Sequence, residues 1–146
     1  MERNGIDHSG LHVTDGSGLE RSNRVTSRLI SDLLVVMWEH PHGEMWRNSL
    51  PISGRDGTIG SRMKDIEGHI YAKTGFIGGV RALSGYARTR RGDWLAFSFI
   101  FNQIPGSVRP FEEIQDDACR VLVEWPNLKP LPPATQPATT TTTSGE

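Results

Sequence analysis

The stretch that decides the fold is HIYAKTGFIGGVRALSGY, residues 69–86. Apolar residues fill its two ends, and a glycine-rich turn separates them. Short apolar segments bounded by glycine are typical of β-strands. We therefore predict a strand at about 69–74, which runs into the tripeptide Lys73-Thr74-Gly75, and a second strand at about 81–89 that returns beside it.

A third strand is predicted at 94–102, where WLAFSFIFN is almost entirely apolar. The four residues before it, RRGD at 90–93, have a length suited to a hairpin. An uninterrupted apolar strand is usually covered on both faces. We therefore expect this strand to lie at the centre of the sheet.

Helices are predicted on either side of these strands. Thr26 is a candidate N-cap, and apolar residues follow it at helical spacing as far as Met37. The dipeptide at 40–41, His-Pro, ends this helix because proline disfavours helical geometry in the residue before it. A final helix at about 110–125 has an apolar side that we expect to pack on the sheet: Phe111, Ile114, Ala118, Val121, Leu122 and Trp125. Helix, antiparallel strands, then helix is an α+β order.

The sequence changes character near its end. Residues 128–146, LKPLPPATQPATTTTTSGE, are rich in proline and threonine and offer little to bury. Such composition is typical of disorder. We therefore predict one folded domain at 1–128 and a disordered Pro/Thr-rich tail at 129–146.

Composition excludes some functions and leaves others open. The net charge of -1 gives no electrostatic reason to expect nucleic acid as a partner. Cys119 is the only cysteine, so no disulfide forms within the chain, and we expect it to be buried on a helix. No apolar run reaches the roughly 18 residues that span a membrane. Residues 1–10 are polar and carry no signal-peptide core.

The tripeptide at 73–75, K-T-G, is the motif that points to chemistry. Together with S-x-x-K and S-D-N it marks penicillin-binding proteins and class A β-lactamases. A tripeptide alone has little weight, because it recurs often by chance. Its surroundings add to it: an apolar strand precedes it, a glycine-rich turn follows, and a second strand returns.

Three segments together resemble one family, the class C low-molecular-mass penicillin-binding proteins. They are A-K-T-G-x-x-x-G-V-x-x-L-S-G-Y from Ala72, the D-G-S-G-L segment from Asp15 with Arg21 and Asn23, and the L-P-x-x-G-x-D-G-T segment from Leu50 with Arg62. They occur in the family's order. The resemblance implies a serine peptidase, a D-alanyl-D-alanine carboxypeptidase or endopeptidase. It also implies the C-terminal part of the penicillin-binding, β-lactamase-like transpeptidase fold.

Such an enzyme removes the terminal D-alanine from peptidoglycan stem peptides through an acyl-enzyme. The resemblance implies that Lys73 supplies a fixed positive charge, which shapes the site and helps to hold the substrate carboxylate. It also implies that the hydroxyl of Thr74 donates to this carboxylate. Gly75 leaves room for the substrate backbone along the strand edge. The backbone N–H of Phe76 is half of the oxyanion hole. The resemblance implies no metal and no cofactor, β-lactam antibiotics as ligands of the complete site, and a periplasmic or extracytoplasmic location.

Two motifs of the family are expected to be missing. The nucleophile of S-x-x-K and the S-x-N motif both precede the D-G-S-G-L segment, and only fourteen residues come before Asp15. Ser61-Arg62-Met63-Lys64 matches S-x-x-K literally, but it occurs in a polar loop just before the K-T-G strand, so we do not assign Ser61 as the nucleophile. Glu20 and Phe76 stand where the family usually has hydroxyl residues. We therefore expect a partial enzyme that is inactive without the missing N-terminal portion of the domain.

Other interpretations remain open at this stage. The chain is alternatively a non-catalytic module that binds D-Ala-D-Ala peptides or a cell-wall partner, or a remnant without function. His40 and His42 form a pair, but the sequence has no cluster that would complete a metal site around them.

Overall fold

The computed structural model describes residues 5–127. The predicted tail at 129–146 and the predicted end of the domain at 128 lie outside them. The described part contains three strands, three α-helices and two short 3-10 helices. In chain order they are α1 (Ser27–Glu39), α2 (Gly43–Asn48), η2 (Gly57–Ile59), η3 (Lys64–Ile66), β1 (Ile70–Ile77), β2 (Val80–Arg88), β3 (Trp94–Phe101) and α3 (Arg109–Glu124).

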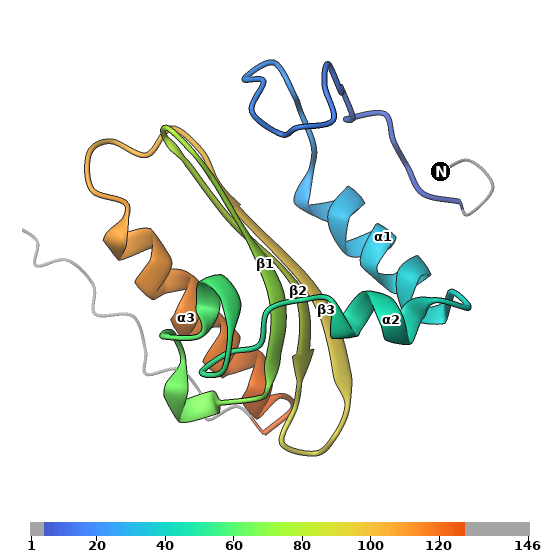
Figure 1. Ribbon diagram of the computed structural model, residues 1–146, viewed down its shortest axis with the longest axis vertical. Helices are drawn as coiled ribbons and strands as arrows, with labels where there is room; N and C mark the ends of the chain where they lie inside the picture. Colours follow the sequence, from blue (N-terminus) through green and yellow to red (C-terminus); the bar gives the residue numbers. More distant parts are fainter. Residues whose placement is uncertain (1–4, 128–146) are drawn as a thin grey trace, which may run out of the picture.

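The strands form one antiparallel sheet in the order β1-β2-β3 (Figure 1), which confirms the α+β class and the three predicted strands. The sequence predicts K-T-G at the end of the first strand. This is wrong: β1 continues to Ile77, so K-T-G lies inside the strand. The turn to β2 is therefore tight, and Gly79 takes the positive φ of 81° that such turns favour. At Gly85 the two strands approach so closely that a Cβ would lie 2.1 Å from the carbonyl oxygen of Tyr71.

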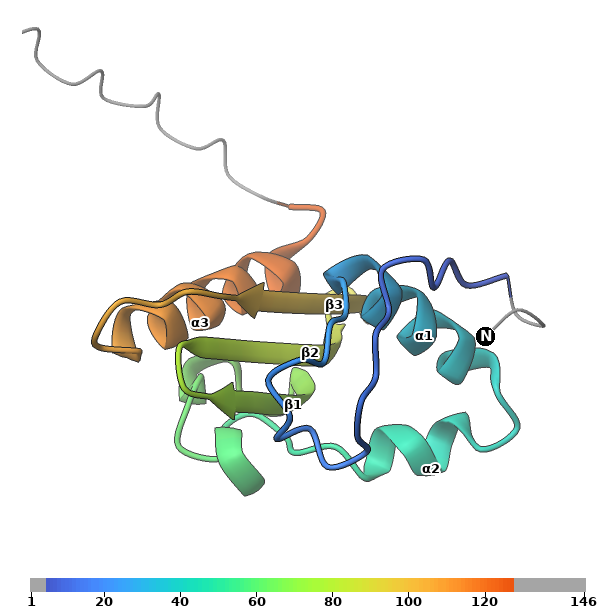
Figure 2. The same ribbon diagram turned by 90° about the horizontal axis from the view of Figure 1, so that it is seen from above.

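A helix covers each face of the sheet. Figures 1 and 2 show α1 on one side of the strands and α3 on the other. Successive side chains of a strand point to opposite faces, so each strand contributes to two cores. The core under α3 contains Ile59, Met63, Ile66, Ile70, Ala72, Leu83, Ala87, Phe97, Cys119 and Val123. The core under α1 contains Leu34, Leu50 and Tyr86, with Ile30, Trp38, Tyr71, Trp94 and Ala96 packed around them.

α1 begins and ends where the sequence predicts. The Thr26 hydroxyl oxygen accepts the backbone N–H of Leu29 at 3.1 Å, which satisfies one of the unpaired donors of the first turn. A side-chain cap of this kind is worth about 1 kcal/mol. The helix stops at Glu39, directly before His40 and Pro41.

The predicted buried side of α3 is partly wrong. The most deeply buried residues of the helix are Gln115, Cys119 and Val123. Ile114, Val121 and Trp125, which we expected to pack on the sheet, are 51%, 50% and 50% exposed, and Trp125 lies just beyond the end of α3. The apolar sector of this helix is wider than the surface that the described sheet presents to it. The side-chain oxygen of the buried Gln115 accepts a hydrogen bond from Arg62, whereas its side-chain nitrogen has no hydrogen-bond partner among the described residues.

An uninterrupted apolar strand is usually central, but the family resemblance also implies that β3 pairs on its far side with a strand of the missing N-terminal portion and is an open edge without it. In the part of the chain that the structure describes, β3 pairs only with β2, and its other edge is open. The central strand is β2. The apolar sequence of β3 reflects the helices on both faces, α1 and α3, which an edge strand shares with a central one.

Candidate active site

The outer edge of β1 is covered along its first half and open along its second. The loop before it runs alongside: Ala72 N–H donates to the carbonyl oxygen of Pro51 at 2.9 Å, and Ser53 N–H donates to that of Ile70 at 2.9 Å. Within residues 5–127, no backbone segment pairs with this edge beyond Ala72. The open edge therefore starts at Lys73.

Alternation along the strand fixes which backbone groups face this opening. In an antiparallel strand the N–H and C=O of one residue point to the same side, and those of the next residue point to the other side. Ala72 donates outward to Pro51, so the N–H and C=O of Thr74 and Phe76 also point outward. The backbone donor of Phe76 that the resemblance singled out therefore lies on the open edge.

Lys73 is exposed and lies beside this edge. Its ammonium donates to the carbonyl oxygen of Thr74 at 3.0 Å. The strand register places Lys73 opposite Ser84, and Ser84 opposite Ser98, so a polar row crosses the sheet on the face that carries α1. The hydroxyls of Ser84 and Ser98 are 2.9 Å apart.

Thr74 faces the other side of the sheet. Its hydroxyl donates to that of Thr58 at 2.9 Å. Both residues line a groove of about 340 Å³ between the edge of β1, the loop at 57–62 and the first turns of α3. Thr58 is the last residue of the L-P-x-x-G-x-D-G-T segment, but the sequence does not indicate that it contacts Thr74. The contact shows that the loop at 50–62 fixes the side chain of Thr74 as well as the backbone of β1.

Phe76 is 66% exposed, yet its ring is held in place. The guanidinium carbon of Arg81 lies 3.5 Å from the ring centroid, an arrangement that stabilises a cation over an aromatic face. Arg81 is the cross-strand partner of Phe76 and forms an ion pair with Glu112 of α3 at 3.0 Å. No local sequence pattern indicates this contact of Arg81, because it depends on the register of two strands.

Gly75 and Ser61 line the same groove. A Cβ on Gly75 would lie 3.1 Å from the Cβ of Ala82, so close strand packing already favours glycine there. Ser61 lies in the turn between η2 and η3, and Lys64 starts a 3-10 helix of three residues. The literal S-x-x-K match is thus on irregular backbone.

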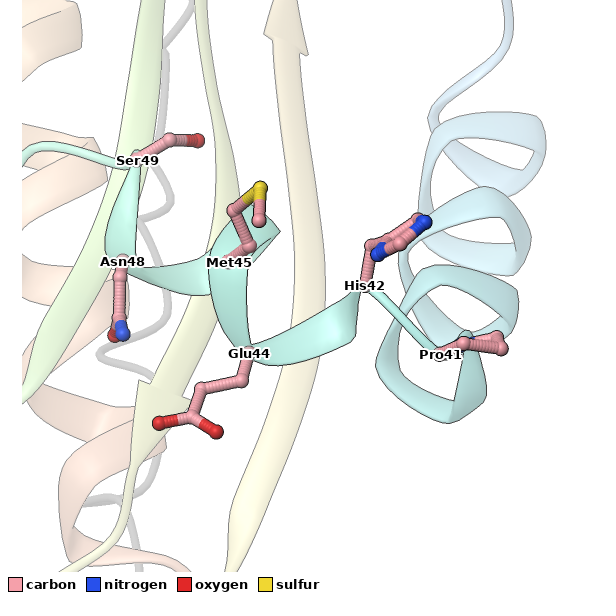
Figure 3. A pocket seen from close by; sticks show the side chains of 6 residues that line it. All are labelled: Pro41, His42, Glu44, Met45, Asn48 and Ser49. Atoms are coloured by element: carbon pink, nitrogen blue, oxygen red, sulfur yellow. The ribbon is translucent and has the colours of Figure 1, made fainter.

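A second pocket lies around α2, but its side chains do not form a catalytic or ligand-binding site. Figure 3 shows Glu44 and Asn48 pointing to one side of this helix and Met45 to the other, so the side chains do not converge. The rings of His40 and His42 have centroids 5.4 Å apart and planes tilted by 49°. Among the described residues, no three His, Cys, Asp or Glu side chains are grouped so that they could hold a metal ion.

Two further properties of the described residues bear on function. Cys119 is fully buried, as expected, and burial raises the pKa of its thiol to about 12, so it is unreactive at neutral pH. No helix in the described part has the length and apolar character needed to cross a bilayer.

Comparison with known proteins gives a consistent result. The sequence model of the D-Ala-D-Ala carboxypeptidase 3 (S13) family matches residues 1–121. A D-alanyl-D-alanine carboxypeptidase from an Actinomadura species is 43% identical over 105 residues, which are 67% of this chain and 19% of that protein. Carboxypeptidase DacB from Mycolicibacterium smegmatis is 35% identical over 106 residues, 67% of this chain and 23% of the relative. The chain thus spans about a fifth of these relatives' length.

A solved structure shares the arrangement of the elements. Penicillin binding protein 4 (dacB) from Haemophilus influenzae superposes with a TM-score of 0.74 at 27% identity, over 85% of this chain and 30% of the other. The structure of the same protein complexed with a β-lactam gives a TM-score of 0.75, over 85% of this chain and 31% of the other.

Proposed function

The chain belongs to the D-Ala-D-Ala carboxypeptidase 3 (S13) family, and from this membership we propose that it forms the K-T-G side of the active site of a serine-type D-Ala-D-Ala carboxypeptidase. One observation carries the proposal. The open edge of β1 starts at Lys73 and presents the outward N–H of Phe76 next to an exposed ammonium. The substrate is a peptidoglycan stem peptide that ends in D-Ala-D-Ala, and a β-lactam occupies the same position.

The peptide binds as an added strand on this edge. Outward N–H and C=O groups of Thr74 and Phe76 pair with the peptide backbone, as in β-strand addition to a sheet edge. The ammonium of Lys73 attracts the terminal carboxylate of the peptide, and the hydroxyl of Thr74 donates to it. To do so, the hydroxyl exchanges its present bond to Thr58 for one to the ligand, at small cost because a hydroxyl both donates and accepts.

The chemical step is acyl transfer. A serine hydroxyl attacks the carbonyl carbon of the penultimate D-alanine, and a base takes the hydroxyl proton. The oxygen that becomes negative accepts hydrogen bonds from the N–H of Phe76 and from the N–H of the nucleophile. The C–N bond then breaks, the leaving D-alanine takes the proton, and water hydrolyses the ester. We propose that the nucleophile and its base come from outside residues 1–146, since Ser61 lies in a turn and the sequence has no S-x-N.

Labelling with a fluorescent penicillin tests the proposal. The chain alone should not be acylated. The chain joined behind the N-terminal part of a carboxypeptidase of the same family should be, and Lys73→Ala should slow that acylation by about 10²–10³-fold, the usual loss for one group that stabilises the transition state. Lys64→Ala is the matched control and should have no effect. Acylation of the chain alone that Ser61→Ala abolishes would instead make Ser61 the nucleophile.

A second candidate is a binding module without catalysis. This candidate is favoured because the open edge of β1, with Lys73, Thr74 and Phe76, is complete within the described residues and could bind a peptide by itself. Calorimetric titration of the chain with a diacetyl-Lys-D-Ala-D-Ala peptide distinguishes it. Binding that Lys73→Ala removes and Lys64→Ala retains supports a module, whereas no heat at millimolar peptide rules it out. In either case we place the site of action at the cell envelope, where the substrates of this family are found.

A further inference from the structure

A cavity of about 340 Å³ lies away from the K-T-G edge, between the last turn of α1 and the start of β3. Figure 2 shows that these two elements lie next to each other. Two partly buried indoles line it, Trp38 from α1 and Trp94 from β3, and the fully buried ring of Tyr86 from β2 lies behind them. The centroid of Trp38 is 5.4 Å from that of Tyr86 and 5.2 Å from that of Trp94, with the ring planes tilted, so the three rings form one continuous aromatic surface.

The aromatic part of the lining offers no free phenol donor. The phenol of Tyr86 donates to the carbonyl oxygen of Leu34 at 2.6 Å, so its hydrogen is already used. Aromatic faces carry partial negative charge and attract cations. The same cluster already binds one: the guanidinium carbon of Arg47 lies 4.2 Å from the centroid of Trp38. A second guanidinium lies near the cluster, because the guanidinium carbon of Arg88 is 6.0 Å from the centroid of Trp94. Neither Arg47 nor Arg88 lines the cavity itself.

Two carboxylates line the cavity beside the rings. They belong to Glu39 and Asp93, both exposed. Within residues 5–127, neither carboxylate has a hydrogen bond or an ion-pair partner. The backbone of Asp93 is nevertheless fixed, because its N–H donates to the hydroxyl of Thr89 and its C=O accepts the N–H of Thr89.

The end of α1 adds to this negative potential. Carbonyl groups at the C-terminal end of a helix carry partial negative charge, and a basic side chain there is stabilising. The last turn of α1 has no basic residue and ends instead at the acidic Glu39. A negative side chain at this position is unfavourable for the isolated helix, and a bound cation would reverse its effect.

From these observations we infer that the cavity binds an alkylammonium group, a positive charge carried on an apolar stem. The ring faces contact the stem and the methyl or methylene groups around the nitrogen, and Glu39 and Asp93 balance the charge. A metal ion does not fit this site, because hard cations require several oxygen ligands and the walls provide ring carbons. A neutral ligand of the same shape would gain nothing from the two carboxylates.

Choline and its neutral isostere 3,3-dimethyl-1-butanol test the charge requirement, since they differ in a nitrogen that replaces a carbon. Each is titrated into the ¹⁵N-labelled chain while the indole N–H signals are followed. Choline should shift the signals of Trp38 and Trp94 and leave that of Trp125 unchanged. Equal effects of choline and the alcohol, or equal shifts of Trp125 and the two cavity indoles, would overturn the inference.

Variants test the contribution of the carboxylates. Glu39→Gln combined with Asp93→Asn should weaken choline binding by about tenfold, the effect of two exposed charge interactions. The matched control, Glu44→Gln with Asp117→Asn, removes two exposed carboxylates elsewhere and should change nothing. Unchanged affinity in the first pair would overturn the inference. Nα-acetyl-lysine methylamide, compared with its norleucine analogue, then distinguishes the source: tighter binding than choline indicates a lysine side chain of a peptide, and weaker binding a free quaternary ammonium.

Discussion

Arg62 and Asp116 form a nearly buried ion pair that ties the loop before β1 to α3. The Nη2 atom of Arg62 lies 2.6 Å from an oxygen of Asp116, its Nε donates to the same oxygen at 2.9 Å, and both side chains are only 16% exposed. The same guanidinium also donates to the side-chain oxygen of Gln115 and to the backbone of Glu112. These contacts therefore hold the loop before β1 against α3.

Removing one partner of this pair should be costly. Asp116→Asn leaves a buried guanidinium without its counter-charge, and we expect the free energy of unfolding to fall by about 3 kcal/mol. Asp32→Asn is the control, because it breaks an exposed pair with Arg28, whose side chain is 83% exposed, and should cost no more than about 0.5 kcal/mol. Urea denaturation measures both. Equal losses in the two variants would contradict the role of the Arg62 pair.

The open edge of β3 should drive self-association of the chain. Its eight residues, WLAFSFIF, include no charge and no proline, the features that usually protect an edge. Alternation from Ala72 through the sheet register places the N–H of Ser98 on the outer side of β3. Ser98→Pro removes this donor and should shift the chain toward monomer in analytical ultracentrifugation.

Ser84→Ala is the matched control for that variant. Both changes remove the hydrogen bond between the hydroxyls of Ser84 and Ser98, but only the proline blocks the edge. The alanine variant should therefore associate like the unmodified chain. A chain that is monomeric before any substitution would show that the edge is not adhesive.

Asp65 should make stability depend on pH in the acid range. Hydrogen bonds from Arg120 lower the pKa of its carboxyl below the usual value of 3.8. A lowered folded-state pKa stabilises the fold above the unfolded-state pKa, and this contribution disappears as the pH falls through the folded-state pKa. The difference in unfolding free energy between the unmodified chain and Asp65→Asn should thus be present at about pH 6 and shrink as the pH falls below 3.8, the usual pKa of the carboxyl.

Salt provides the check on this interpretation. The side chains of Asp65 and Arg120 are 56% and 39% exposed, so their attraction is screened. The difference at about pH 6 should shrink in about 1 M NaCl, where the screening length is about 3 Å. A difference that persists at low pH would mean that Asp65→Asn acts through packing and not through charge.

Local patterns explain which features of the fold could be predicted. The strands, the Thr26 cap and the stop before Pro41 depend on residues within one turn or one strand of each other, and the structure confirms them. The resemblance that K-T-G and its flanking residues indicated is confirmed at the level of the family. The roles of Lys73, Thr74, Gly75 and Phe76 remain predictions, for which the geometry of the β1 edge supplies the support.

By itself, the sequence determined the α+β class, the order of the elements and the position of K-T-G beside a glycine turn, because these follow from side-chain periodicity and backbone preference at neighbouring residues. Only the tertiary structure decided that Gln115 is among the most deeply buried residues of α3 and that Thr58 and Arg81 contact Thr74 and Phe76. Each of these features depends on strand register or on contacts between residues distant in the sequence. Such contacts form only when the whole chain packs, and no local pattern records them.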